Sequence, residues 1–415
     1  MANKNVHLIK DRIFKKNILK INFERKTDRS EITKLNFLTH ILFLSSNKYK
    51  TERKMLTRAQ ELYDVGQESF VNIYANATIL CFRFTFLKDQ YTEPNNSKAV
   101  MDFINEILFN PNVKNNKFNK KAFEIAKKEV VDEIKTYFEN KNTYSRLKMI
   151  EYMDKDSPAA IEVVGTLDEI EKITRENLYE FYLNVINTSL IDIFAFGDFK
   201  EKDLSFLSKR GANPKIEYFY KTKEHEVRTY IERDNISQSK LVMGYNLIDV
   251  SPKEAEYAMQ IYLYLLGLGP TSKLFVNVRE KASLCYSISV TTRSINSFMM
   301  INAGIAAANF DKTVELISKQ VDEMRKGNFK EKDIESAKLT IKSSYQEILE
   351  NPYSIINSYE AVNYLGYDLI KTRIKKIDLV TKEDIINFAN KIKLNTIFLL
   401  EGKKKWKCLN IKILA

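Results

Sequence analysis

Hydrophobic residues recur along this chain with the spacing of helices in some segments and with the spacing of strands in others. The same order of such segments occurs twice. Segments 32–44 and 255–266 have the apolar content of buried helices. The segment 81–86 (CFRFTF) alternates with a period of two, which is typical of a half-buried strand. A pair of strands is expected after each apolar helix, at 69–76 and 79–87 in the first half and at 285–292 and 297–305 in the second.

The order of later elements is also repeated. A helix is expected at 98–108 and again at 311–325, and each is followed by a longer helix that opens on a phenylalanine, Phe118 or Phe329. Both halves then have an Ile/Val-Thr pair before a late helix and end on an apolar strand closed by glycine. Repetition in this order predicts an α+β fold of two tandem homologous domains. Each is expected to be a largely antiparallel sheet with helices packed on one face.

Length agrees with this division, because 415 residues suit about two domains. We expect the first domain to span 1–210 and the second 226–415. Segment 211–225 would form the linker, since a charged stretch there contains Gly211 and Pro214. The second apolar helix has a clear start, with Ser251 as N-cap and Glu254 completing a capping box.

Composition excludes several classes of protein. The net charge of +12 comes from lysines scattered among acidic residues along helices, and no nucleic-acid motif accompanies them, so we expect no nucleic-acid partner. No run approaches the ~18 apolar residues that a membrane span needs. The charged first residues lack a secretory pattern. Three widely spaced cysteines (Cys81, Cys285, Cys408) read as reduced thiols, and the expected location is cytoplasmic.

The most informative chemistry lies at 266–287 (LGLGPTSKLFVNVREKASLCYS). Arg279 supplies a planar, permanently charged fork of donors, and the hydroxyl of Tyr286 can donate to an oxyanion. On residue type alone, Arg279 could instead pair with a nearby acid and Tyr286 could face the core. Gly267 and Gly269 lack the context of a phosphate-binding loop.

This segment resembles the corresponding block of the insulinase/pitrilysin family, zinc peptidases with an inverted H-x-x-E-H motif. The nearest branch is bacterial and similar to the mitochondrial processing peptidase. Shorter similarities occur at 237–245 and 165–174, and the resemblance extends from about residue 5 to 402. It implies that Arg279 and Tyr286 contact substrate.

The metal motif of that family is degenerate in this chain. Asn36, Thr39 and His40 share one helix face and take the positions of the first histidine, the glutamate and the second histidine. Glu133 is the best match for the third ligand, with Glu129 as the alternative. An amide is a poor zinc ligand and threonine cannot act as a general base near neutral pH. The resemblance therefore implies no complete catalytic site, and no metal or cofactor in this chain.

Three functional hypotheses follow. The first is a noncatalytic, substrate-orienting subunit of a heterodimeric zinc peptidase, in which a homologous partner holds the zinc and peptides are the substrate. The second is a peptide-binding or scaffold protein without a catalytic partner. The third is a self-sufficient hydrolase with an unusual metal site built on His40 and Glu133.

Overall fold

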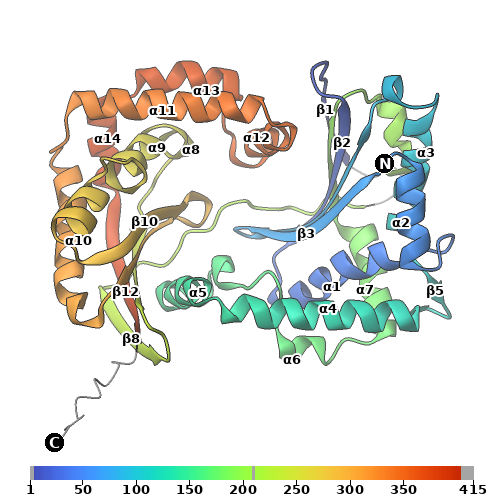
Figure 1. Ribbon diagram of the computed structural model, residues 1–415, viewed down its shortest axis with the longest axis horizontal. Helices are drawn as coiled ribbons and strands as arrows, with labels where there is room; N and C mark the ends of the chain where they lie inside the picture. Colours follow the sequence, from blue (N-terminus) through green and yellow to red (C-terminus); the bar gives the residue numbers. More distant parts are fainter. Residues whose placement is uncertain (1–3, 208–210, 403–415) are drawn as a thin grey trace, which may run out of the picture. The chain divides into compact units, whose positions relative to one another are not determined.

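The computed structural model describes residues 4–207 and 211–402, which form two compact units. Each unit combines most of one sequence half with a helix-bearing segment of the other half (Figure 1). The first unit contains residues 1–140, 156–221 and 342–377, and the second contains residues 141–155, 222–341 and 378–415, within the described limits.

The first unit is built on a five-stranded sheet with the order β1-β7-β2-β4-β3. Only the β1–β7 pair is parallel, and the other three pairs are antiparallel. Because β3 ends the order, its outer edge has no partner strand among the described residues. The strands are β1 (Lys4–Ile9), β2 (Lys16–Lys26), β3 (Gly66–Tyr74), β4 (Ala77–Leu87) and β7 (Leu190–Phe196).

The second unit repeats this topology with the order β8-β12-β9-β11-β10. Again one edge pair, β8–β12, is parallel and the other three are antiparallel. The equivalent strand order confirms the predicted α+β duplication. The strands are β8 (Arg228–Asp234), β9 (Ser239–Leu247), β10 (Cys285–Arg293), β11 (Phe298–Ile305) and β12 (Ile392–Gly402).

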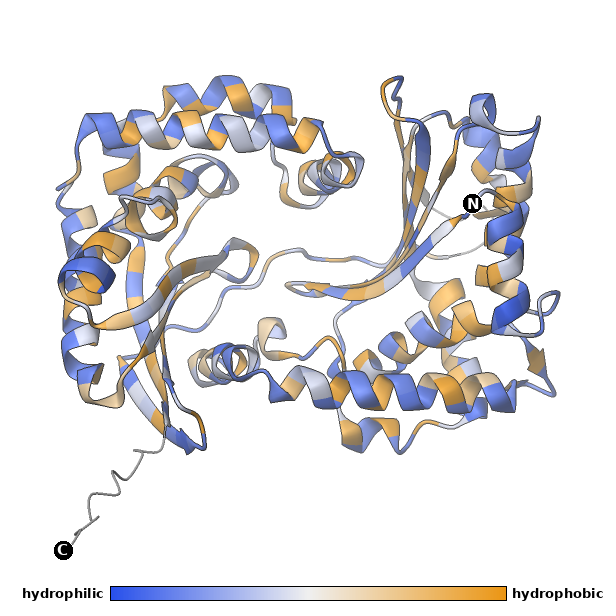
Figure 2. Ribbon diagram, in the orientation of Figure 1, coloured by the Kyte–Doolittle hydropathy of each residue, from blue (hydrophilic) through white to orange (hydrophobic). Residues whose placement is uncertain are grey.

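Helices of the first half cover one face of the first sheet and enclose its hydrophobic core. The core includes Phe23, Phe37, Phe82, Ile104 and Val130. The long helices mix hydrophobic and hydrophilic residues along their length, as amphipathic helices do (Figure 2). These helices are α1 (Ile32–Leu44), α2 (Glu52–Glu61), α3 (Asn96–Phe109), α4 (Lys120–Glu139), α6 (Leu167–Ile170) and α7 (Arg175–Thr188), with a small β5–β6 ribbon (Val113–Lys114, Lys117–Phe118).

The helices of the second half include α8 (Pro252–Glu256), α9 (Ala258–Leu263), α10 (Phe310–Arg325), α11 (Glu331–Leu349), α13 (Ile370–Lys376) and α14 (Lys382–Ala389). The predicted capping box of Ser251 and Glu254 is confirmed. The helix expected at 255–266 is broken, because Tyr257 leaves helical geometry (φ −121°, ψ −74°) and the chain continues as a π-helical turn, η5 (Tyr264–Leu268).

The opposite face of each sheet is covered by a helix from the other half of the sequence. Helix α12 (Pro352–Leu365) places Ile356 and Tyr364 in an apolar cluster with Ile18 and Phe194 of the first sheet. Helix α5 (Lys141–Met153) lies on β9 and β12 of the second sheet. Each sheet is therefore covered on both faces, beyond the single helical layer that the sequence predicts.

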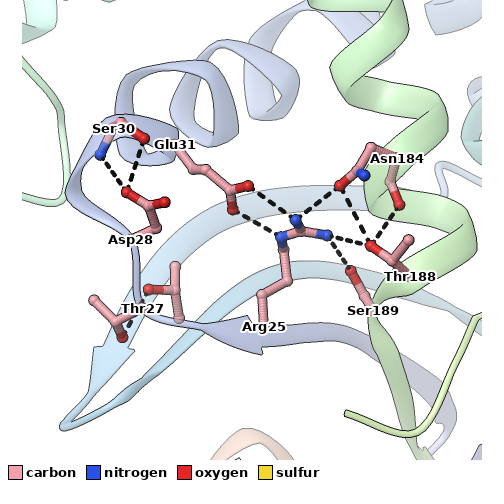
Figure 3. Close-up of polar contacts among 9 residues, drawn as sticks. Arg25, Thr27, Asp28, Ser30, Glu31, Asn184, Thr188 and Ser189 are labelled. Atoms are coloured by element: carbon pink, nitrogen blue, oxygen red, sulfur yellow. Dashed lines mark hydrogen bonds and ion pairs between the residues drawn. The ribbon is translucent and has the colours of Figure 1, made fainter.

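A polar network around Arg25 fixes the start of α1 (Figure 3). The guanidinium of Arg25, at the end of β2, donates two hydrogen bonds of 2.9 Å to the carboxylate of Glu31. It also donates to Thr188 Oγ1 and to Asn184 Oδ1, both at 2.8 Å, on α7. Such a bidentate ion pair fixes orientation as well as distance, so it sets the direction in which α1 leaves the sheet.

No helix within the described parts of the chain is both long enough and apolar enough to cross a membrane. Cys81 and Cys285 are buried and free, and Cys408 lies outside the described residues. The predicted limits of the sequence domains and their linker stay predictions, since they concern the duplicated halves and not these compact units.

Candidate functional site

The degenerate motif lies on α1, which packs against α4 in the first unit. Phe37 of α1 stacks on Phe123 of α4, with ring centroids 4.9 Å apart, and this contact sets the spacing of the two helices. Asn36 and Thr39 are buried, and the side chain of His40 is 25% exposed. Glu129 and Glu133 lie on α4 and reach the same place. The structure therefore brings together all five residues that the sequence aligned with the metal motif.

Asn36 acts as a hydrogen-bond donor. Its Nδ2 donates to Glu133 Oε2 at 2.7 Å and to the backbone oxygen of Val164 at 3.2 Å. Because the carbonyl of Val164 can only accept, the amide group is oriented with its nitrogen toward Glu133. The position of the first histidine ligand thus holds an amide that donates a hydrogen bond to the carboxylate of Glu133.

His40 lies between two carboxylates. Its Nδ1 is 3.1 Å from Glu129 Oε2, and its Nε2 is 3.3 Å from Glu133 Oε2. An imidazole with an acceptor at each nitrogen satisfies both contacts only as the doubly protonated cation. Burial lowers the pKa of His40, but the hydrogen bonds and charges of Glu133 and Glu129 outweigh burial and raise it overall. The hydrogen bond from His40 in turn lowers the pKa of Glu133.

Thr39 cannot replace the missing glutamate. Its hydroxyl donates to the backbone oxygen of Asn36 at 2.7 Å, one turn earlier in the same helix. The backbone oxygen of Thr39 accepts a hydrogen bond of 2.8 Å from Ser69 Oγ of β3. A hydroxyl bonded back to its own helix is neither ionised nor directed at a substrate, so no general base occupies this position.

This donor set does not fit a zinc ion. Asn36 offers only a neutral amide, whose Nδ2 donates to Glu133, and the Thr39 hydroxyl donates to its own helix, so His40 is the only imidazole at the motif positions. Across residues 4–207 and 211–402, no group of three or more His, Cys, Asp or Glu side chains is arranged to hold a metal ion.

A cavity of about 650 Å³ opens beside His40. Its walls come from α1, α2, α4, the segment at 163–164 and the edge strand β3, and they combine apolar side chains with carboxylates. An edge strand beside a cavity is suited to an extended peptide, which can add to the sheet and place alternate side chains in the cavity. The lining includes His40, Phe43, Leu44, Glu52, Met55, Leu56, Gln67, Glu68, Ser69, Phe70, Val71, Glu129 and Glu133.

Arg279 and Tyr286 lie in the second unit, on the π-helical segment η6 (Leu274–Lys281) and on β10. Both side chains are exposed, and Tyr286 is 71% exposed, so it does not face the core. The guanidinium of Arg279 stands 4.8 Å from the ring centroid of Phe275. Burial raises the pKa of the neighbouring Cys285 thiol, while the charge of Arg279 acts in the opposite direction.

A β-bulge accounts for the exposure of Tyr286. In the β10–β11 register Cys285 pairs with Ile305 and Ser287 pairs with Gly304, so Tyr286 is the extra residue between consecutive pairs. A bulge leaves one residue unpaired and re-aims its side chain, and such bulges are frequent next to active sites. Neither the bulge nor the cavity beside β3 is predicted from the sequence, although the alternation at 69–76 indicates the strand itself.

Comparison with known proteins agrees with these features. A family model described as the Peptidase M16 inactive domain matches residues 172–341. "Probable inactive metalloprotease YmfF" of Bacillus subtilis (strain 168) is 27% identical over 406 residues, which are 95% of this chain and 95% of that protein. "Uncharacterized zinc protease YmfH" of the same strain is 23% identical over 306 residues, covering 70% of this chain and 69% of the other.

A solved structure has the same fold over nearly the whole length. The crystal structure of a conserved protein from Enterococcus faecalis V583 is similar with a TM-score of 0.91 and 27% identity, covering 97% of both chains. Residues 172–341 are thus similar to the M16 inactive domain, and nearly the whole chain is similar to a protein named as a probable inactive metalloprotease. The resemblance to a noncatalytic insulinase-like protein, which the sequence indicated, is confirmed.

Proposed function

We propose that this chain is the noncatalytic, substrate-orienting subunit of a heterodimeric insulinase-like zinc peptidase that acts on peptides or unfolded segments. The observation that carries the proposal is the network of Asn36, His40 and Glu133, which occupies the metal-motif positions with hydrogen bonds instead of free ligands. A homologous partner would hold zinc on an intact H-x-x-E-H motif and activate water there.

Arg279 and Tyr286 are the groups with which this chain would act. Both are exposed, and Tyr286 stands on β10, the edge strand of its sheet. An extended peptide added to that edge would bring its carbonyl groups near a guanidinium and a phenolic hydroxyl. These donors orient a carbonyl and stabilise the negative charge that develops on its oxygen during hydrolysis.

The relatives add support for a pair of proteins. One bacterial strain has both a relative named as an inactive metalloprotease and a relative named as a zinc protease. A heterodimer of the proposed kind requires two homologues in one cell, one that binds zinc and one that is inactive. We also propose a cytoplasmic location, for which the free thiols of Cys81 and Cys285 are the support.

The test is co-expression of this chain with the zinc-bearing homologue of its own organism. We expect the two to co-purify and to cleave unstructured peptides only together. The double variant Arg279→Ala/Tyr286→Phe should keep the complex intact and lower kcat/KM by about 10²-fold or more, as loss of oxyanion donors does. Arg228→Ala/Tyr91→Phe, which changes an exposed arginine and an exposed tyrosine elsewhere, is the matched control. Unchanged hydrolysis in the first variant would refute the assigned role.

A peptide-binding protein without a catalytic partner is the second candidate, and the cavity beside β3 favours it. This alternative requires peptide binding by the chain alone, a stable assembly that survives Arg279→Ala, and no hydrolysis with any homologue. Zinc analysis of the untagged chain separates both candidates from a self-sufficient hydrolase. We expect a zinc content near zero per chain, whereas a content near one would restore His40 and Glu133 as ligands.

A further inference from the structure

One face of the second sheet carries a row of hydroxyl groups beside its free edge. Ser287, Ser289 and Thr291 alternate along β10, so all three point to the same face, and all are exposed. Ser289 pairs with Asn302 of β11, and Asn302 pairs with Val242 of β9. Ser287 likewise pairs with Gly304 of β11, and Gly304 pairs with Lys240 of β9. The face is therefore polar at its β10 edge.

Helix α5 crosses this face and leaves a hollow beside the hydroxyl row. The helix lies close to β9 because Gly244 has no side chain, and a Cβ there would stand 2.4 Å from Met149 Sδ and 2.5 Å from Met153 Sδ. Its first turns, by contrast, border a cavity of about 290 Å³ over β9, β10 and β11. The polar lining includes Arg146, Lys240, Ser287, Ser289, Thr291 and Asn302.

The lining has two cations and no carboxylate. Arg146 is exposed, and its side chain has no hydrogen-bond or ion-pair partner among the described residues. Lys240 is held by a 2.8 Å hydrogen bond from its Nζ to Gln238 Oε1, which is neutral and leaves the charge uncompensated. Asn302 adds an amide whose Nδ2 lies 3.5 Å from Thr291 Oγ1, whereas its Oδ1, buried and without a partner among the described residues, can accept from an N–H of a peptide. Hydroxyl, amide, ammonium and guanidinium groups in one hollow form a site for an anion of carboxylate size.

We propose that this pocket binds the carboxylate group of an extended peptide. Because β10 is the edge strand, a peptide that adds to it sends alternate side chains over the face that carries Ser287, Ser289 and Thr291. A carboxylate on that side meets Arg146 and Lys240. It can come from an acidic side chain or from the C-terminus of the peptide. The inference rests on the proposed function, since it names the peptides that the second unit selects.

The experiment measures peptide binding by the full chain with fluorescence anisotropy. The probe is an N-acetylated peptide of about ten uncharged, strand-forming residues in three versions. One has an amidated C-terminus, one has a free C-terminal carboxylate, and one is amidated with a single glutamine changed to glutamate. We expect at least one carboxylate version to bind about tenfold or more tightly than the neutral version, as charge-assisted hydrogen bonds imply. The two carboxylate versions show which source the pocket takes.

Arg146→Gln/Lys240→Gln should remove this difference and leave binding of the neutral version unchanged. Arg146→Gln alone changes only an exposed side chain, so it tests the pocket without risk to folding. Arg228→Gln, at an exposed arginine of β8 in the same sheet, is the matched control for net charge. Equal binding of all three versions, no binding of any version, or an equal loss in Arg228→Gln would overturn the proposal.

The same variants separate this inference from the proposed function. Hydrolysis by the complex that depends on Arg279 and Tyr286, together with no preference for a carboxylate, would refute the pocket and leave the function standing. A carboxylate preference that depends on Arg146, without any effect of Arg279 and Tyr286 on hydrolysis, would support the pocket and refute the assigned catalytic contribution.

Discussion

The two sheets have the same strand order, but the helix from the other sequence half attaches to them by different chemistry. On the first sheet, α12 is held by buried charges. Lys20 Nζ lies 2.6 Å from Glu360 Oε2, and Asn22 Nδ2 donates to Glu360 Oε1 at 2.8 Å. On the second sheet, the centre of α5 is held by the close approach of Met149 and Met153 to a glycine, Gly244, and its polar contacts lie at the edge strand, where Tyr144 and Tyr152 donate to Glu232 of β8.

The charged face of the first sheet is almost completely paired. Tyr364 and Tyr218 donate to the buried Glu24, and Asp192 accepts from Asn363 and contacts His7. Burial raises the pKa of Glu24 to about 7, with the two tyrosine hydrogen bonds acting against it. Arg83 of β4 and Glu68 of the edge strand β3 also form an ion pair. The β10 side of the second sheet carries hydroxyls and, at Arg146 and Lys240, cations without a carboxylate partner among the described residues.

The two halves therefore share their backbone topology, whereas the polar groups on their sheets differ. Where charges neutralise one another under a helix, they hold two segments of chain together. Where cations remain beside a free edge, they are available to a ligand. The edge strands differ in the same sense, because β3 pairs with β4 in regular register whereas β10 carries the bulge at Tyr286.

The largest expected effect breaks the charged attachment. Glu360→Leu leaves the ammonium of Lys20, whose side chain is 4% exposed, buried without its carboxylate. We expect the free energy of unfolding of the first unit to fall by about 3–5 kcal/mol, measured by urea denaturation. Lys20→Met/Glu360→Met should recover most of this loss, because it removes both charges. A double variant as unstable as the single one would mean that the ion pair itself stabilises the fold.

A smaller effect should follow from disturbing the apolar attachment. Gly244→Val places methyl groups where the sulfur atoms of Met149 and Met153 already lie, so α5 or the methionines must move. We expect a loss of about 1–3 kcal/mol in the unfolding free energy. Gly66→Val on β3 is the control, since a Cβ there meets only ordinary contacts at 3.5 Å from Thr85. Equal losses at the two glycines would contradict the close packing of α5.

Much of this fold could be predicted from the sequence, because local pattern specifies local structure. The apolar run at 32–44 coincides with α1, and Ser251 caps α8 as its spacing indicates. The exchange of α5 and α12 between units could not be predicted, since it depends on contacts between residues far apart, such as Lys20 and Glu360. A lysine in β2 and a glutamate in a distant helix carry no local sign of pairing.

The positions of the candidate site residues could be predicted from the sequence, but their hydrogen bonds could not. Spacing placed Asn36, Thr39 and His40 on one helix face, and the structure adds that Glu133 and Glu129 take both nitrogens of His40. Whether a histidine binds metal or carries a proton depends on the acceptors around it in three dimensions. The bulge at Tyr286 could not be predicted for a similar reason. A one-residue shift of register does not change the pattern of hydrophobic and polar residues along β10.

The ion pairs of His40 should appear in the pH dependence of stability. The raised pKa of His40 contributes stability below its ordinary value of 6.5, and this is lost as the pH rises through the folded pKa. The lowered pKa of Glu133 contributes stability at pH values above 4.5, its ordinary pKa. This stability is lost as the pH falls through the pKa of Glu133 in the folded chain. Both contributions are present between these two values.

His40→Gln should therefore destabilise the chain more at pH near 5.5 than at pH near 8.5. The difference should stay below about 1 kcal/mol, because the side chains of Glu129 and Glu133 are 45% and 42% exposed. Thermal melts at the two pH values measure it, with His225→Gln as the control for an unrelated histidine. A larger loss at the higher pH would mean that His40 is neutral in the folded chain.

The smallest expected effect on stability compares one chemical change in the two units. Tyr364→Phe removes a buried hydroxyl that donates to Glu24 and accepts from Asn22, so we expect a loss of about 1–3 kcal/mol. Tyr286→Phe removes an exposed hydroxyl from a bulged residue, and the unfolding free energy should change by less than about 0.5 kcal/mol. If Tyr286→Phe leaves stability unchanged but reduces hydrolysis by the complex, the hydroxyl of Tyr286 serves substrate binding and not folding. A loss of stability in Tyr286→Phe equal to that in Tyr364→Phe would instead make Tyr286 a structural residue.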